Sequence, residues 1–74
     1  MLSWKLLLFN DSIHSFDEVI RALIQIGLQK EEADNKAWEA HLTGNAVVYQ
    51  GDKLGCERRD SILKTYGLTT KITQ

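Results

Sequence analysis

The sequence contains no proline, only one cysteine and no long apolar segment. Nothing in its composition marks a linker or an internal repeat, so the 74 residues predict one compact domain over 1–74. Cys56 has no second cysteine with which to form an internal disulfide. The longest apolar run, Leu6 to Phe9, is far shorter than the roughly 20 residues of a membrane helix, and too short for a signal-peptide core. We therefore expect a cytoplasmic protein that does not associate with membranes.

An excess of charge of one sign is also missing. Lys and Arg number 9 against 10 for Asp and Glu, and the formal net charge is −1. Domains that bind nucleic acid normally carry a basic excess, so we expect no nucleic-acid partner. A chain of this size buries only about 60% of the surface that its unfolded form exposes, which leaves little room for a deep catalytic cleft. We expect a monomer that is not an enzyme.

The first third of the chain predicts a strand followed by a helix. Trp4 to Phe9 is a short apolar run that ends at Asn10, Asp11 and Ser12, as a largely covered strand does. Ser15 and Glu18 have the spacing of a capping box, in which each side chain accepts a backbone N–H at a helix start. Apolar residues then recur every three or four positions up to Gly27. This pattern predicts one amphipathic helix.

The rest of the chain predicts two more helices and two more strands. We expect a helix from about Lys30 to Thr43, a strand from Asn45 to Gln50, a helix from Lys53 or Cys56 to Tyr66, and a strand from Leu68 to Thr73. The order βααβαβ favours an α+β fold, with three helices packed on a small three-stranded, mostly antiparallel sheet.

Polar groups at the end of the first strand and on the second helix could meet beside an apolar hollow. The inward face of the second helix is small, with Ala37 and Ala40, and His41 lies at the edge of that face. If the two helices pack together, Asn10 and Asp11 would approach His41 there. The result would be a shallow apolar pocket with a polar rim.

Such a rim suits the recognition of an ammonium group. An α-amino group, with a pKa of about 7.7 to 8.0, is mostly protonated at neutral pH and offers three N–H donors. The amide oxygen of Asn10, the carboxylate of Asp11 and a ring nitrogen of neutral His41 are acceptors that could surround it. A chain without a free amino terminus would lack these donors and would be rejected.

The segment "WKLLLFNDSIHSFDEVIRAL", followed by "EEADNKAWEAHLTGNAVV", resembles the ClpS adaptor family. Members of that family have an apolar strand that ends in Asn-Asp, a first helix, and a second helix that closes on a histidine shortly before a glycine. The resemblance extends from Trp4 through Val48, and more loosely to the C-terminus. It implies a ClpS-like fold and an adaptor that binds the first residue of N-degron substrates and delivers them to the AAA+ unfoldase of the Clp protease, without a cofactor.

The resemblance also implies roles for individual residues. Asn10, Asp11 and His41 would hold the α-amino group of the substrate. The pocket for its side chain, usually that of Leu, Phe, Tyr or Trp, would be lined by Phe16, Val19, Ala37, Ala40 and Leu68. Ser12, Ile13 and His14 could border the pocket, although His14 on its own is expected to be a surface loop residue. Arg58 is the nearest candidate for contact with the unfoldase.

This chain departs from the family pattern at the pocket. Ser12 stands where members usually have a second aspartate, His14-Ser15 where they have Thr-Pro, and Ala37 and Ala40 where they have bulkier apolar residues. We expect a weaker ammonium site, and a pocket that the two alanines either enlarge or leave less well packed. We also expect a preference for aromatic over aliphatic first residues. The extension ahead of the first strand, which the family uses in delivery, is expected to be reduced to the first three residues.

Other interpretations of the same residues stay open from the sequence alone. Asn10, Asp11 and Ser12 are common turn residues, and a histidine near a helix C-terminus is stabilised by the helix dipole. The chain could thus be a diverged interaction or regulatory module whose amine pocket is weakened or inactive. A metal site built from His14, His41 and Cys56 matches no recognised ligand spacing, so we expect none. No motif places a base beside Ser12 or Cys56 for nucleophilic catalysis.

Overall fold

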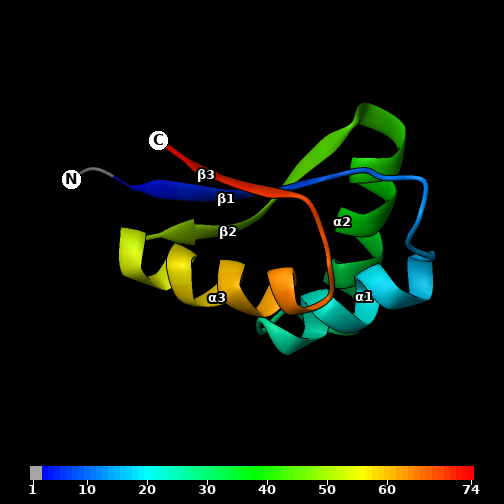
Figure 1. Ribbon diagram of the computed structural model, residues 1–74, viewed down its shortest axis with the longest axis horizontal. Helices are drawn as coiled ribbons and strands as arrows, with labels where there is room; N and C mark the ends of the chain where they lie inside the picture. Colours follow the sequence, from blue (N-terminus) through cyan, green and yellow to red (C-terminus); the bar gives the residue numbers. More distant parts are fainter. Residues whose placement is uncertain (1–2) are drawn as a thin grey trace.

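The computed structural model describes residues 3–74, and Figure 1 shows a three-stranded sheet with helices against one of its faces. The elements are β1 (Trp4–Phe9), α1 (Phe16–Gln25), α2 (Lys30–Thr43), β2 (Asn45–Gly51), α3 (Lys53–Thr65) and β3 (Thr70–Thr73). The predicted α+β fold and its βααβαβ order are confirmed. The expected reduction of the N-terminal extension concerns the first three residues, of which Met1 and Leu2 lie outside the described residues.

The sheet has the strand order β2-β1-β3, with both pairs of neighbours antiparallel. Side chains alternate along the central strand β1, so that Leu6 and Leu8 are buried on the side of the helices. The register with β2 shifts between Leu6 and Leu7, which leaves Val48 as an extra residue on β2. Ala46 and Val48, which are two residues apart on β2, are both buried in the core.

The two helices that follow β1 begin and end as their sequences predict. Ser15 Oγ accepts the backbone N–H of Glu18 at 3.2 Å, and Glu18 Oε1 accepts the backbone N–H of Ser15 at 3.1 Å, so the predicted capping box forms. Helix α2 ends at Thr43 and is capped by Gly44, whose φ of 98° lies in the left-handed region that glycine adopts without strain. The face that α2 turns inward consists of alanines, which allows its backbone to approach its neighbours closely.

The last strand is shorter than predicted. Helix α3 ends at Thr65, and the backbone N–H of Leu68 donates to the carbonyl oxygen of Leu63 at 3.3 Å. Leu68 therefore belongs to the turn that closes α3, and β3 begins only at Thr70. Its side chain is 5% exposed and packs in the hydrophobic core.

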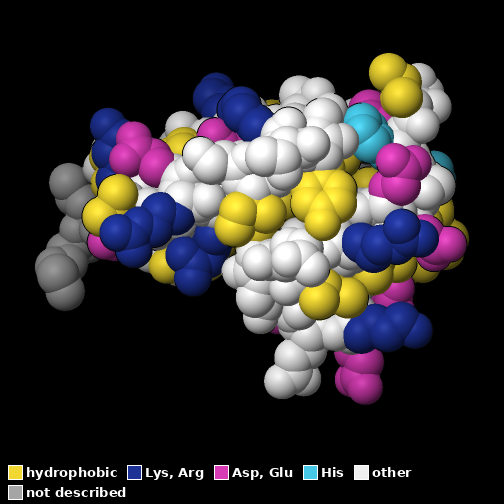
Figure 2. Space-filling view, turned by 60° about the horizontal axis from the view of Figure 1, so that its bottom comes forward, with side chains coloured by type: hydrophobic (Ala, Val, Ile, Leu, Met, Phe, Trp, Pro, Cys, Tyr) yellow, Lys and Arg dark blue, Asp and Glu magenta, His cyan; other side chains and the backbone are white. Residues whose placement is uncertain are grey.

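Charged side chains of both signs are interspersed on the helix-covered side of the molecule (Figure 2). Apolar side chains lie between them, over the area where the helices meet. Within residues 3–74, no helix combines the length and the apolar character needed to cross a membrane.

Candidate functional site

A cavity of about 190 Å³ opens where the end of β1, the start of α1 and the C-terminal half of α2 meet. Its polar wall includes Asn10, Asp11, Ser12, His14, Ser15 and His41. Its apolar wall includes Leu8, Phe9, Phe16, Val19, Ala37 and Ala40. The cavity thus joins hydrogen-bonding groups and an apolar surface that come from distant parts of the chain.

A backbone contact explains why the end of β1 meets the end of α2. The N–H of Asn10 donates to the carbonyl oxygen of Gly44 at 3.0 Å. Gly44 closes α2 one turn after His41, so this hydrogen bond brings the Asn10 loop and His41 to the same opening. The alanines at 37 and 40 are nearly fully buried, and their small side chains leave the hollow beneath that opening.

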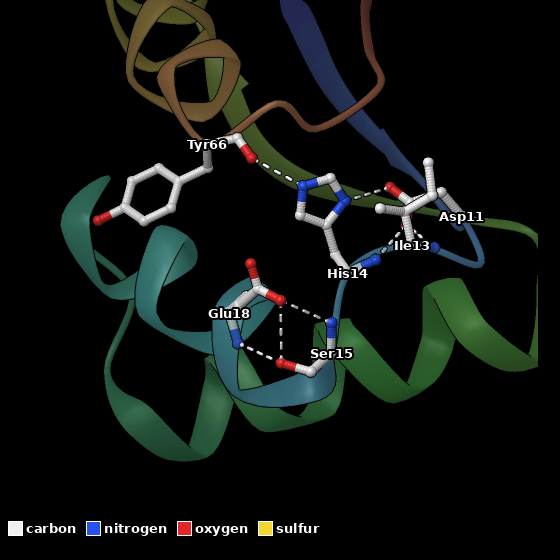
Figure 3. A network of polar contacts seen from close by, with 6 residues as sticks. All are labelled: Asp11, Ile13, His14, Ser15, Glu18 and Tyr66. Atoms are coloured by element: carbon white, nitrogen blue, oxygen red, sulfur yellow. Dashed lines mark hydrogen bonds and ion pairs between the residues drawn. The ribbon is translucent and has the colours of Figure 1, made fainter.

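The Asp11 carboxylate organises the loop that forms the polar wall, as Figure 3 shows. Asp11 Oδ1 accepts the backbone N–H groups of Ile13 and His14 at 2.9 and 2.8 Å, which forms a tight turn. Asp11 Oδ2 lies 2.8 Å from Nδ1 of His14. On the other side of the same ring, Nε2 lies 2.8 Å from the carbonyl oxygen of Tyr66, the residue that caps α3. One ring therefore connects the loop after β1 to the end of α3.

These contacts shift the pKa values of both partners. Burial acts to raise the pKa of Asp11, but the hydrogen bonds from His14 and Ile13 outweigh it and hold that pKa below its usual value. The hydrogen bond to Asp11 is the main cause that raises the pKa of His14, and the bond to Tyr66 adds to it against the opposing effect of burial. Both shifts favour an ion pair between the carboxylate and the imidazolium.

The rings of Phe16 and His41, which line the cavity, contact the ring of Trp38, which does not line it. The Phe16 ring lies 4.7 Å from that of Trp38 and 5.2 Å from that of His41, measured between centroids. Trp38 and His41 are nearly perpendicular, at 84° and 5.9 Å. Such tilted and edge-to-face contacts are favourable for aromatic rings and hold Phe16 and His41 in place. Trp38 was not predicted, although its position three residues before His41 puts both on one side of α2.

The structure brings most of the predicted site residues to this cavity. Asn10, Asp11 and His41 line it, as do Phe16, Val19, Ala37 and Ala40. Ser12 and His14 line it as well. His14 was expected to be a surface loop residue, but its side chain is only 13% exposed because it is held between Asp11 and Tyr66.

Three predicted residues lie elsewhere. Ile13 is 85% exposed and does not line the cavity, because the turn around Asp11 directs its side chain outward. Leu68 is not a pocket residue, since the turn after α3 places its side chain in the core. Arg58 is exposed on α3, and its neighbour Arg59 stacks on the ring of Tyr49, with Cζ 3.8 Å from the centroid.

In the part of the chain that the structure describes, neither Cys56 nor a group of metal-ligating side chains forms a second site. Cys56 is fully buried, and burial raises the pKa of its thiol, which disfavours the reactive thiolate. Among residues 3–74, no three His, Cys, Asp or Glu side chains are grouped so that they could hold a metal ion. Among the described residues, the cavity is therefore the candidate functional site.

Comparison with known proteins identifies the family. A family model described as "ATP-dependent Clp protease adaptor protein ClpS" matches residues 2–71. None of the curated proteins matches the sequence significantly. Among solved structures, Agrobacterium tumefaciens ClpS2 bound to L-phenylalaninamide superimposes with a TM-score of 0.84 at 21% sequence identity, covering 95% of this chain and 93% of that one. The fold is thus shared with ClpS2, and the match over residues 2–71 shows that the chain belongs to the ClpS family of Clp protease adaptors.

Proposed function

We propose that this adaptor binds the free N-terminal residue of substrate proteins in the cavity and delivers those substrates to the AAA+ unfoldase of the Clp protease. The observation that carries the proposal is the cavity itself. Asn10 and Asp11 approach it from the end of β1, and His41 approaches it from α2. Between them lies an apolar hollow formed by Phe16, Val19 and the two alanines.

The polar wall fits an ammonium group. Oxygen atoms of Asn10 and Asp11 and a ring nitrogen of neutral His41 can accept its three N–H donors. Hydrogen bonds to a charged group contribute about 1.5 to 3 kcal/mol each. Because an acetylated terminus has no charge and keeps only one of the three N–H donors, the site should discriminate strongly against it.

The apolar wall fits one large side chain. The cavity of about 190 Å³ is smaller than the roughly 300 to 1,000 Å³ of pockets for drug-sized ligands, so it suits a single amino acid. The ligand of ClpS2, L-phenylalaninamide, is an aromatic amino acid with a free amine and no carboxylate, as at the start of a protein chain. That likeness supports a bulky hydrophobic or aromatic first residue here. The small alanines at 37 and 40 favour aromatic over aliphatic ones.

Fluorescence anisotropy tests this function. Peptides that begin with Phe, Trp, Leu or Ala and are otherwise identical would be labelled at their C-termini and titrated with the protein. We expect Phe and Trp to bind best, Leu less well and Ala least. Acetylation of the Phe peptide should weaken binding by about a hundredfold, since at least two charge-assisted hydrogen bonds are lost. Equal affinity for all four peptides, or for the acetylated one, contradicts the proposal.

Delivery requires a contact with the unfoldase, and we propose that Arg58 contributes to it. This side chain is exposed on α3, whereas Arg59 is occupied by Tyr49 and by the carbonyl oxygen of Gly55 at 3.1 Å. Arg58→Ala should therefore slow degradation of an N-degron substrate by the Clp protease without changing peptide affinity. A loss of peptide affinity in this variant would contradict the separation of the two surfaces.

A further inference from the structure

The two ring nitrogens of His14 both face acceptors. Nδ1 lies 2.8 Å from a carboxylate oxygen of Asp11, and Nε2 lies 2.8 Å from the backbone carbonyl oxygen of Tyr66. Neither oxygen can donate a hydrogen bond when Asp11 is ionised. A neutral imidazole carries one N–H and would leave one of these contacts without a proton, so the geometry is satisfied only by the imidazolium.

The surroundings of the ring also favour a positive charge. Tyr66 caps the C-terminus of α3, where the helix dipole is negative. Besides Asp11, the carboxylate of Glu18 in α1 acts on the ring and raises the pKa of His14. The turn after α3 comes close, since a Cβ added at Gly67 would lie 3.4 Å from Nε2. The backbone of Tyr66 approaches the His14 ring, while its phenol points away (Figure 3). His41, from α2, lines the same cavity as His14.

The charge on His14 affects how well the Asp11 carboxylate can accept a further hydrogen-bond donor. Two backbone N–H groups already occupy Asp11 Oδ1, and the imidazolium occupies Oδ2. A carboxylate offers about four lone-pair positions, so one acceptor position remains. The pair of Asp11 and charged His14 has no net charge, whereas the pair with neutral His14 carries −1.

We propose that His14 is a positioning residue of the amine site, and that its positive charge competes with the ammonium group of the substrate for the Asp11 carboxylate. This inference rests on the proposed function, because it concerns the same site. Protonation of His14 and binding of a free amino terminus then oppose each other. Peptide affinity should rise as the pH increases through the titration of His14, and by reciprocity a bound peptide should promote loss of the His14 proton.

The test compares wild type with His14→Gln at each pH. The affinity of the Phe peptide would be measured by anisotropy from about pH 5.5 to pH 8, the range in which histidine titrates. The ratio of the two dissociation constants removes the titration of the peptide amine and of every other group that is common to both proteins. We expect the ratio of wild type to variant to fall by about threefold to tenfold with increasing pH, which corresponds to a pKa change of 0.5 to 1 unit.

A second measurement uses wild type alone and does not depend on the folding of a variant. NMR titration of the ring of His14, with and without the Phe peptide, should show a lower pKa in the complex, with a change that matches the affinity ratio. His14→Thr is a second neutral variant, with the residue that the ClpS resemblance places at this position.

The outcomes separate the two proposals. A ratio that stays constant, or that rises with pH, overturns the role of His14 while leaving peptide binding intact, and so does a His14 pKa that the peptide does not lower. Failure of every peptide to bind overturns both the proposed function and the role of His14.

Discussion

The two walls of the cavity are held in place by different forces. The loop from Asn10 to Phe16 is fixed by hydrogen bonds, from the turn around Asp11 to the capping box of Ser15 and Glu18. The wall formed by α2 is fixed by packing, with nearly buried alanines and with Trp38 and His41 in ring contacts with Phe16. The loop wall therefore responds to protonation and charge, and the helix wall responds to side-chain volume.

In the proposed function, this difference would assign the two parts of recognition to different residues. The loop and His41 carry the acceptors and would decide whether an amine is accepted. The alanines of α2 line the hollow and would decide which side chain fits. A change on one wall should thus alter one property of binding and leave the other nearly unchanged.

His41→Ala should give the largest loss of affinity. Removal of one acceptor for the ammonium group should weaken binding of the Phe peptide by at least about tenfold, since such a bond contributes about 1.5 to 3 kcal/mol. The melting temperature should change little, because the His41 side chain is exposed. Leu42→Ala is the matched control, since Leu42 is the next residue, is 74% exposed and does not line the cavity. A large drop in melting temperature would instead assign His41 a structural role.

Ser12→Asp should strengthen binding by about tenfold, because it adds a carboxylate to the polar wall beside the ammonium site. The gain should appear equally for Phe and Leu peptides, since the apolar wall is unchanged. Ser61→Asp on α3 adds the same charge away from the cavity and should have little effect. If neither wild type nor Ser12→Asp binds a free-amine peptide, the chain is a diverged interaction module without an amine pocket.

Ala37→Val should produce the smallest effect, a change in selectivity. The added methyl groups reduce the hollow, so the preference for Phe over Leu should shrink by roughly threefold to tenfold. The discrimination against acetylated peptides should persist. Ala33→Val is the matched control, because Ala33 faces the core from the same helix without lining the cavity. It should lower the melting temperature through overpacking and leave the ratio of Phe to Leu affinities unchanged.

Local patterns in the sequence predicted the elements well, because each pattern has a local cause. The capping spacing of Ser15 and Glu18 and the alternation of β1 depend only on nearby residues. The placement of Asn10 and His41 around one cavity was anticipated from the ClpS resemblance and from the alanine face of α2. The hydrogen bond from the backbone N–H of Asn10 to the carbonyl oxygen of Gly44 explains why the end of β1 lies beside the end of α2.

The parts that the sequence did not predict depend on contacts between distant residues. His14 contacts Tyr66, 52 positions away, and nothing near His14 indicates that partner. Leu68 was expected in the pocket, but the turn after α3 turns its side chain into the core. Trp38 was not predicted because its ring contact with Phe16 joins residues that are distant in the sequence.

The most direct test of the central claim is an NMR titration of the uniformly ¹⁵N-labelled protein with L-phenylalaninamide, followed by the same titration with its N-acetyl derivative. We predict that the free amine shifts the amide signals of residues 10–16 and 37–41 and leaves those around Arg58 on α3 unchanged, while the acetylated compound shifts neither set. Shifts that lie away from the cavity, or equal shifts from both compounds, would contradict an amine site at the mouth of this cavity.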